Sequence, residues 1–184
     1  MDAPTSSHDN YTDAHVRSVL NGAKSVAVVG ASVNTARPSY FVVRYLLDKG
    51  YTVYPVNPGH AGHAGHAGKE IRGAKVYASL ADIPGPIDMV DIFRASDAVM
   101  GVVEEALRLQ PRPKVIWMQL GVRNDKAAKV AEDAGLTVIM NRCPKIEYGR
   151  LSGEIGWAGV NSRVISSRKP ARAQNNFQNL TLNR

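Results

Sequence analysis

The sequence predicts an α/β protein: a Rossmann-like, doubly wound parallel sheet of about five strands, with helices on both faces. Two observations lead to this prediction. Short apolar segments rich in valine and isoleucine, typical of strands buried on both faces, alternate along the chain with helical segments of about a dozen residues. The first of these strands is followed by a glycine turn and a helix that begins with proline. Such alternation gives a parallel sheet with helices packed on both sides.

The first strand, turn and helix form the unit around which the predicted fold is organised. The strand, Val26 to Val29, ends at Gly30, a residue that permits a sharp turn or the close approach of a ligand. Pro38 begins the helix, where its missing N–H costs no hydrogen bond, and Gly50 ends it. A second strand, Tyr51 to Val56, follows. Because free amide groups and the helix dipole converge at the start of such a helix, the sequence predicts an anion site there.

The remaining segments continue the alternation. Further strands are predicted at Val76–Tyr77, Ile87–Phe93, Lys114–Leu120 and Thr137–Met140. Further helices are predicted after an Asn10 cap, at Ser79–Ile83 as a single turn, at Ser96–Leu109, after an Asn124 cap, and around Lys145–Arg150 over the last strand. In parallel sheets of this class, ligands bind beyond the carboxyl ends of the strands, so the functional residues are expected at that edge.

Length and composition predict one domain with two flanking segments. The 184 residues, 44% of them hydrophobic, suffice for a single core. We predict a disordered N-terminus at residues 1–9, a domain at 10–153, and a basic, disordered tail at 154–184. Residues 161–184 carry five basic residues and no acidic ones. They lack the interleaved aromatic residues of a nucleic-acid site, so we interpret them as a solvated tail.

Several absences predict a soluble, cytoplasmic protein. No apolar run approaches the roughly 18 residues of a membrane span, and the N-terminus resembles neither a signal peptide nor a transit peptide. The one cysteine, Cys143, rules out an internal disulfide framework. We interpret it as a small buried residue rather than a reactive thiol.

Residues 60–68 are three copies of His-Ala-Gly. Three histidines at this period can chelate a transition metal, but glycine and alanine do not hold ligands in a fixed geometry. We therefore interpret the repeat as an inert loop insertion, which costs little entropy, and predict no metal site.

The segment after the first strand lacks the dinucleotide fingerprint. G-x-G-x-x-G requires glycine where Ser32 and Thr35 stand. The acidic residue that would bind the ribose of NAD at the end of the second strand is replaced by Asn57. Hydride transfer with NAD is therefore disfavoured, whereas NADP stays open because Arg37 could meet its extra phosphate.

Six motifs, in order and with matching spacing, resemble the CoA-binding protein family. They are Val28–Ser32, Arg37–Ser39, Tyr54–Pro58, Asp88–Arg94, Trp117–Val122 and Arg142–Pro144. Members of this family are small Rossmann-like proteins similar to the CoA-binding domains of the succinyl-CoA ligase alpha subunit and of ADP-forming acyl-CoA synthetases. The resemblance covers about residues 20–151. It leaves the His-Ala-Gly triplets as extra length, and it implies coenzyme A or an acyl-CoA as the small-molecule ligand.

The resemblance also implies which residues contact CoA. The set at the pyrophosphate consists of Gly30, Ala31, Ser32, Arg37 and Ser39. The set along the nucleotide and the cleft consists of Asn57, Pro58, Arg94, Gln119 and Gly121. Amide groups, hydroxyls and guanidinium groups of this kind are the donors that the phosphates of CoA require.

Some of these residues have structural alternatives. Arg37 could be a solvated loop residue, and Arg94 could pair with Asp91 or Asp97. Gln119 could satisfy loop backbone instead of a ligand. Asp91 interrupts an apolar strand, and we expect it to bond to the N-terminus of a neighbouring helix.

The predicted cleft contains no identifiable general base. The ligases that this family resembles form a phosphohistidine in a downstream domain, whereas no histidine follows Leu151. The five histidines are His8, His15 and those of the repeat, and none stands at the end of a core strand. We therefore predict CoA binding without catalysis. An NADP-dependent oxidoreductase and a subunit of an acyl-CoA ligase are the alternatives.

Overall fold

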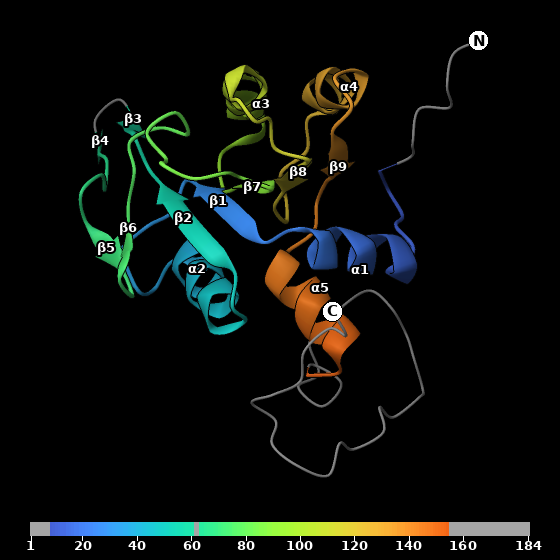
Figure 1. Cartoon of the computed structure of the whole chain (residues 1–184), viewed down its shortest axis with the longest axis horizontal. Coiled ribbons are helices and arrows are strands. Elements are labelled where there is room, and N and C mark those ends of the chain that lie inside the picture. The colour runs from blue at the N-terminus through green and yellow to red at the C-terminus, as the bar shows by residue number, and fades with distance from the viewer. Residues whose placement is uncertain (1–7, 61–62, 155–184) are drawn as a thin grey trace.

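The computed structural model describes residues 8–60 and 63–154, and it contains one five-stranded parallel sheet with helices on both faces (Figure 1). The strands are β1 (Ser25–Val29), β2 (Thr52–Val56), β7 (Met89–Ile92), β8 (Val115–Met118) and β9 (Thr137–Ile139). Their order is β2-β1-β7-β8-β9, and every neighbouring pair is parallel. The predicted fold class is confirmed.

The strand order places a switch point between β1 and β7. The chain moves from β1 outward to β2, and then returns to the other side of β1 with β7. The two connections therefore leave the carboxyl ends of β1 and β7 in opposite directions. In open α/β sheets, this divergence creates the crevice in which ligands bind.

The helices form one layer on each face of the sheet. Figure 1 shows α3 and α4 above the sheet and α1, α2 and α5 below it. The upper layer is α3 (Val99–Arg108), preceded by the 3-10 turn η1 (Ser96–Ala98), and α4 (Asp125–Asp133). The lower layer is α1 (Asp13–Gly22), α2 (Pro38–Asp48) and α5 (Pro144–Ser152).

Strand register assigns alternate residues to the two layers. Val28, Asp91 and Trp117 form a row across β1, β7 and β8, and Ile139 continues it on β9. The three apolar members of this row belong to the lower core, with α1, α2 and α5. Side chains paired across parallel strands point to the same face, so Asp91 is a carboxyl group placed within this apolar row.

Two predicted helices begin or behave differently in the structure. Thr12, not Asn10, caps α1, because its Oγ1 accepts a hydrogen bond from the amide of His15 (3.2 Å). Residues 79–83 form turns rather than a helical turn. There the amide of Ile83 donates to the carbonyl oxygen of Leu80 (3.3 Å), which closes one turn, and the amide of Leu80 donates to Glu105 Oε1 (2.7 Å). Helix α5 packs against α1 and α2.

Two hairpins extend the chain between β2 and β7. The His-Ala-Gly repeat contributes β3 (Gly59–His60) and β4 (His63–Ala64), and β5 (Glu70–Ile71) pairs with β6 (Ala74–Lys75). The predicted strand at Val76–Tyr77 is reduced to a bridge between Tyr77 and Val56. Two-residue strands are too short to show a hydrophobic period, so periodicity does not predict these hairpins.

The repeat lies directly against the end of β2. The amide of His66 donates to the carbonyl oxygen of Asn57 (3.3 Å). A Cβ atom added at Gly65 would lie 2.6 Å from that oxygen, so the close approach requires glycine. The interpretation of the His-Ala-Gly repeat as an inert insertion stays a prediction.

The predicted terminal segments fall mostly outside the described residues: 1–7 at the N-terminus and 155–184 in the tail. His8, however, is buried, with Nδ1 2.9 Å from the hydroxyl of Tyr11, so this residue of the predicted N-terminal segment packs against the domain. Glu154 also contacts the fold, because it accepts a hydrogen bond from the hydroxyl of Tyr45 (2.7 Å). None of the helices in residues 8–60 and 63–154 is both long and apolar enough to span a membrane.

Candidate functional site

Gly30 brings the carboxyl ends of β1 and β7 together. Its φ of 93° lies in the left-handed region, and a Cβ atom there would lie 2.4 Å from the carbonyl oxygen of Phe93. No other residue fits this position without moving the backbone of the segment after β7. Position 30 therefore requires glycine because of the contact with Phe93, in addition to the local turn predicted from the sequence.

The glycine turn is tied to β2 by its own backbone. The amides of Gly30 and Ala31 both donate to the carbonyl oxygen of Val56, at 2.8 and 3.1 Å. Asn57 Nδ2 donates to the carbonyl oxygen of Ala31 (2.6 Å), and its Oδ1 accepts from the amide of Gly59 (2.9 Å). Asn57, in the position of the acidic residue of NAD-binding proteins, thus joins two loops. The two amides face β2, so they are not free donors for a phosphate.

The start of α2 is the open part of this region. Ser39 is buried, and its Oγ accepts a hydrogen bond from the amide of Ser32 (3.1 Å), which fixes the loop to the helix. Arg37 occupies the N-cap position, but its side chain makes no capping bond. Its exposed guanidinium has no hydrogen-bond or ion-pair partner within the described residues. Pro38 has no amide hydrogen, and the amide of Tyr40 donates to the carbonyl oxygen of Arg37 (3.0 Å), so the amide of Ser39 is the donor that this turn leaves to an anion, with the Arg37 guanidinium beside it.

A pocket of about 550 Å³ opens at the carboxyl ends of β7, β8 and β9, between α2 and α5. We call this cavity the apolar pocket. It is lined by Pro38, Phe41, Val42, Phe93, Arg94, Gln119, Leu120, Val122, Cys143, Lys145 and Ile146. Two predicted site residues, Arg94 and Gln119, belong to it. Since Pro38 is also the first residue of α2, the apolar pocket adjoins the open helix start.

Asp91 and Gln119 form a buried polar pair at the apolar pocket. Gln119 Nε2 lies 3.1 Å from each carboxylate oxygen of Asp91. The expectation that Asp91 bonds to a helix N-terminus is therefore wrong, because its partner is the side chain of Gln119, which follows β8. Complete burial raises the pKa of Asp91 to about 8, although the hydrogen bond from Gln119 opposes this shift.

Cys143 stands at the N-cap of α5 and lines the apolar pocket. Burial raises the pKa of its thiol, and the negative charge of Asp91 acts in the same direction. A protonated, buried thiol agrees with the interpretation of Cys143 as a small core residue.

The other predicted residues are distributed around the edge. Within the described residues, Arg94 forms no ion pair with Asp91 or Asp97, and its side chain is partly buried in the pocket wall. Gly121, with φ 77°, donates its amide to Asn141 Oδ1 (2.9 Å) and lies outside the pocket lining. Pro58 is exposed and also lies outside that lining. Contacts of all these residues with CoA stay predictions.

Most of the lining residues were not among the predicted contacts, and Phe41, Lys145 and Ile146 are three of them. Phe41, on the helix that begins at Pro38, has a side chain that is 45% exposed. Lys145 and Ile146 come from the segment that was expected only to cover the last strand. A phenylalanine in the first turn of a helix at a predicted anion site is the one signal that could have indicated the pocket.

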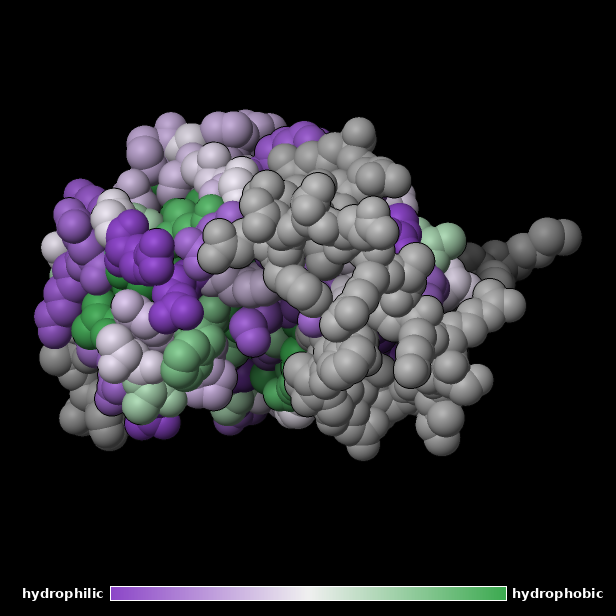
Figure 2. Space-filling view, turned by 90° about the horizontal axis from the view of Figure 1, so that it is seen from below, coloured by the Kyte–Doolittle hydropathy of each residue, from purple (hydrophilic) through white to green (hydrophobic). Residues whose placement is uncertain are grey.

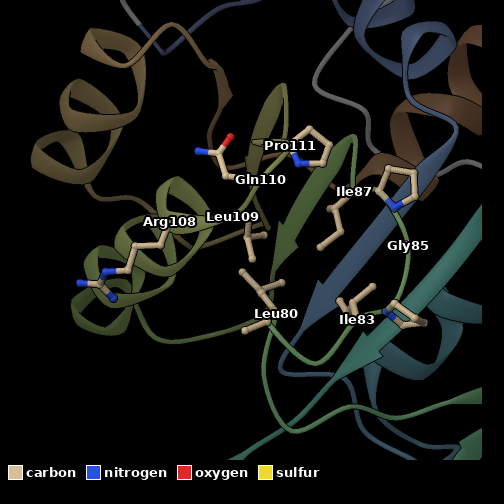
Figure 3. A pocket seen from close by; sticks show the side chains of 11 residues that line it. Leu80, Ile83, Gly85, Ile87, Arg108, Leu109, Gln110 and Pro111 are labelled. Atoms are coloured by element: carbon tan, nitrogen blue, oxygen red, sulfur yellow. The ribbon is translucent and has the colours of Figure 1, made fainter.

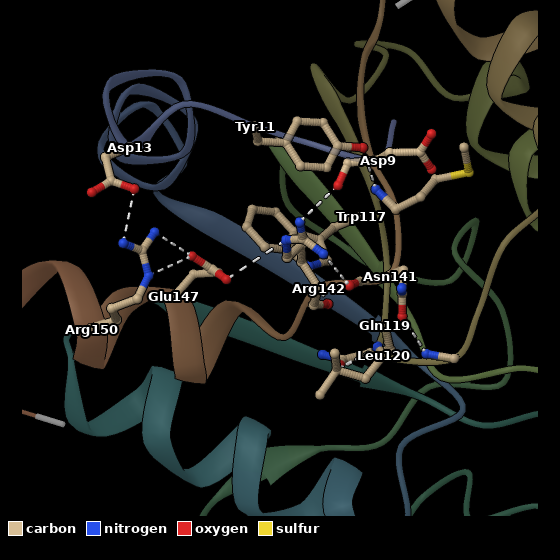
Figure 4. Close-up of polar contacts among 12 residues, drawn as sticks. Asp9, Tyr11, Asp13, Trp117, Gln119, Leu120, Asn141, Arg142, Glu147 and Arg150 are labelled. Atoms are coloured by element: carbon tan, nitrogen blue, oxygen red, sulfur yellow. Dashed lines mark hydrogen bonds and ion pairs between the residues drawn. The ribbon is translucent and has the colours of Figure 1, made fainter. Parts of the chain in front are cut away.

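Arg142, next to Cys143, has a structural role (Figure 4). Its Nη2 donates to the carbonyl oxygen of Asp9 (3.1 Å), and its Nε lies 3.9 Å from Glu147 Oε1. Trp117 Nε1 donates to the carbonyl oxygen of Arg142 (2.8 Å). This arginine therefore joins the N-terminal segment to the start of α5, and its charge is engaged within the protein.

A second pocket, of about 480 Å³, lies at the opposite edge of the sheet. Figure 3 shows that side chains of residues 80–87, before β7, face those of residues 108–111, after α3. Ligands of doubly wound sheets bind at the carboxyl edge, so this pocket is not at the expected ligand site.

The strand order, the glycine turn and the open start of α2 define a doubly wound α/β protein with a candidate ligand site at its switch point. A comparison with known protein families matches residues 24–149 to the CoA binding domain. The chain therefore belongs to the CoA-binding domain family.

Known relatives are similar to this chain over different lengths. The uncharacterized protein YneT of Bacillus subtilis is 37% identical over 139 residues, which are 76% of this chain and 96% of that protein. The ADP-forming acetate–CoA ligase I subunit alpha of Pyrococcus furiosus is 37% identical over 86 residues, which are 45% of this chain and 17% of the subunit. The solved structure of a hypothetical protein from Pyrococcus horikoshii has 38% identity and a TM-score of 0.69, covering 82% of this chain and 99% of that one.

Proposed function

We propose that this protein binds coenzyme A or an acyl-CoA at the carboxyl edge of its sheet, and that it does so without catalysing a reaction. The observation that carries the proposal is the start of α2, where the amide of Ser39 and the exposed guanidinium of Arg37, which has no partner within the described residues, adjoin the apolar pocket. CoA combines a pyrophosphate with a long, mainly uncharged arm. An anion site beside an apolar pocket matches this combination.

Each part of the ligand has a complementary region. The pyrophosphate lies at the start of α2, near Arg37 and the hydroxyl of Ser32. The nucleotide lies toward the end of β2, beside Asn57 and Pro58. The pantetheine arm then runs past Arg94 and Gln119. Membership in the CoA-binding domain family supports this arrangement.

The chemistry of the pocket lining supports binding without catalysis. None of the described histidines lines it. Asp91 is completely buried behind Gln119, and Cys143 carries a protonated thiol at neutral pH. The lining therefore offers neither an accessible general base nor a thiolate nucleophile.

A ligand panel tests the binding proposal. Ligands that bind only the folded state raise the melting temperature. At a concentration of about a hundred times Kd, such a ligand adds about 2.7 kcal/mol to the free energy of unfolding. We expect CoA and acetyl-CoA to stabilise the protein, and NAD at equal concentration to have no effect. A larger response to NADP than to CoA would favour the oxidoreductase instead.

A subunit of an acyl-CoA ligase is the second candidate, because one of the relatives is the alpha subunit of an ADP-forming acetate–CoA ligase. The protein is therefore incubated with acetyl-CoA, ADP and phosphate, and ATP formation is measured. We expect no ATP above the protein-free control. Formation of ATP would contradict binding without catalysis while leaving CoA binding intact.

A further inference from the structure

We propose that the apolar pocket binds the acyl chain of an acyl-CoA, so that the protein prefers thioesters with an apolar chain of medium length over free CoA. This inference rests on the proposed function, because the CoA moiety anchors the ligand at α2. It adds a ligand class and a second subsite to that function.

The lining of the apolar pocket is mainly hydrocarbon. Phe41 and Val42 contribute from α2, Leu120 and Val122 from the segment after β8, and Ile146 from α5. Its volume of about 550 Å³ lies within the range of small-molecule sites, roughly 300–1,000 Å³. A phosphate group would lose its hydration among these side chains, whereas an acyl chain loses only unfavourable contact with water.

The exposed apolar surface of the described residues is concentrated at this pocket. Three large hydrophobic side chains are exposed in residues 8–60 and 63–154: Leu120 at 53%, Phe41 at 45% and Val130 at 39%. Two of the three line the apolar pocket, and they come from different layers of the fold. Figure 2, which views the molecule from the side of α1, α2 and α5, shows hydrophobic areas set among hydrophilic residues on the visible part of this face. An apolar chain in the pocket would cover Leu120 and Phe41.

The two subsites are continuous. Arg37 and Pro38 are neighbours in the chain: the first stands at the open helix start, and the second lines the apolar pocket. Arg94 and Lys145 add cationic N–H donors to the pocket lining. These donors suit the amide and thioester carbonyl oxygens that lie between the pyrophosphate and the acyl chain of an acyl-CoA.

The polar floor of the pocket suits retention of the thioester rather than its cleavage. Gln119 is held by Asp91 through two 3.1 Å contacts, which fix its orientation. Burial raises the pKa of the Cys143 thiol, so this group stays protonated and does not attack the thioester carbon.

The first test measures affinity against chain length with the unaltered protein. Dissociation constants of CoA and of acetyl-, hexanoyl- and octanoyl-CoA are measured by calorimetry at one salt concentration. A fully buried methylene tightens binding by about fourfold. Because Phe41 and Leu120 leave the pocket open to water on one side, we expect about two- to fourfold per methylene up to octanoyl-CoA.

The second test uses matched variants. Leu120→Gln places a polar side chain at the pocket, Ile146→Trp fills it, and Val130→Gln makes the same polar change at an exposed hydrophobic residue on α4, away from the pocket. We expect Leu120→Gln and Ile146→Trp to flatten the dependence on chain length and to weaken octanoyl-CoA about tenfold more than free CoA. Val130→Gln should leave the dependence unchanged.

The outcomes separate this inference from the proposed function. If CoA binds but affinity does not rise with chain length, the acyl subsite is wrong and CoA binding stands. If Ile146→Trp weakens free CoA as strongly as octanoyl-CoA, the pantetheine arm occupies the pocket and the acyl subsite is again wrong. If neither CoA nor any acyl-CoA binds, the proposed function itself fails.

Discussion

The two faces of the sheet are packed with different chemistry. Among the described residues, the fully buried core on the side of α3 and α4 is aliphatic apart from methionine, from Val90 and Ile92 on β7 to Ile116 and Met118 on β8, and Tyr54 and Tyr77 pack only at its margin. The core on the side of α1, α2 and α5 includes buried aromatic residues, with Trp117 on the sheet, and the Cys143 thiol. The fully buried Asp91 lies on this second face.

This difference separates stability from binding. Aliphatic side chains give up no hydrogen bonds to water when they are buried, and they offer no polar group to a ligand. The opposite face accepts polar groups that must find partners, and it leaves a pocket between α2 and α5. We infer that the α3 and α4 face mainly stabilises the fold, whereas the α2 and α5 face carries the site.

A large-to-small substitution on the aliphatic face should have the largest effect. Ile116 is fully buried there, so Ile116→Ala should lower the free energy of unfolding by about 2–5 kcal/mol through lost burial and a cavity. CoA affinity of the folded variant should stay within about twofold. Denaturant unfolding and calorimetry measure the two quantities. A parallel loss of affinity would show that the two faces are not separable in function.

Arg37→Ala should show the reverse pattern. A charge-assisted hydrogen bond to a phosphate is typically worth about 1.5–3 kcal/mol, so CoA binding should weaken by roughly ten- to a hundredfold. The melting temperature without ligand should barely change, because the side chain is exposed and its guanidinium is unpaired within the described residues. Arg44→Ala, an exposed arginine two turns further along α2, is the control. Equal dissociation constants for Arg37→Ala and wild type would make Arg37 a solvated loop residue.

Two aspartates three residues apart should differ in the sign of their effect on stability. Burial raises the folded-state pKa of Asp91 to about 8. Between about pH 4 and pH 8, this carboxyl group is then ionised in the unfolded chain but protonated in the folded one, and stability falls as pH rises. Asp91→Asn should therefore stabilise the protein by about 1–3 kcal/mol at pH 7, with a gain that shrinks toward pH 4.

Asp88 provides the matched comparison. Burial by itself would raise its pKa, but hydrogen bonds from the amides of Lys24 and Ser25 and from the side chain of Lys114 lower it overall. Its contribution is therefore present above the unfolded pKa and is lost as pH falls through the folded one. Asp88→Asn should destabilise by about 1 kcal/mol at pH 7. Unfolding curves from pH 4 to pH 8 measure both variants, and a destabilised Asp91→Asn variant would contradict the assigned burial cost.

Local patterns in the sequence determined the class of fold and the position of the anion site. Periodicity identified the five core strands and five helices within a few residues. The sequence Gly30 to Pro38 marked the turn and the helix start, because glycine and proline have backbone preferences that act within one or two residues. The Asn124 cap of α4 was also correct, with its Oδ1 accepting from the amide of Ala127 (2.9 Å). Family membership followed from six short motifs, whose spacing does not depend on where the helices and strands begin and end.

Only the tertiary structure decided which segments meet. The pairing of β1 with both β2 and β7 places the carbonyl oxygen of Phe93 against Gly30 and ties Asn57 to the glycine turn. The same packing buries Asp91 against Gln119, and it gathers α2, α5 and three strand ends around the apolar pocket. These contacts join residues up to about a hundred positions apart in the chain. No local preference encodes them, because they depend on strand order and on how the helices fill the two faces of the sheet.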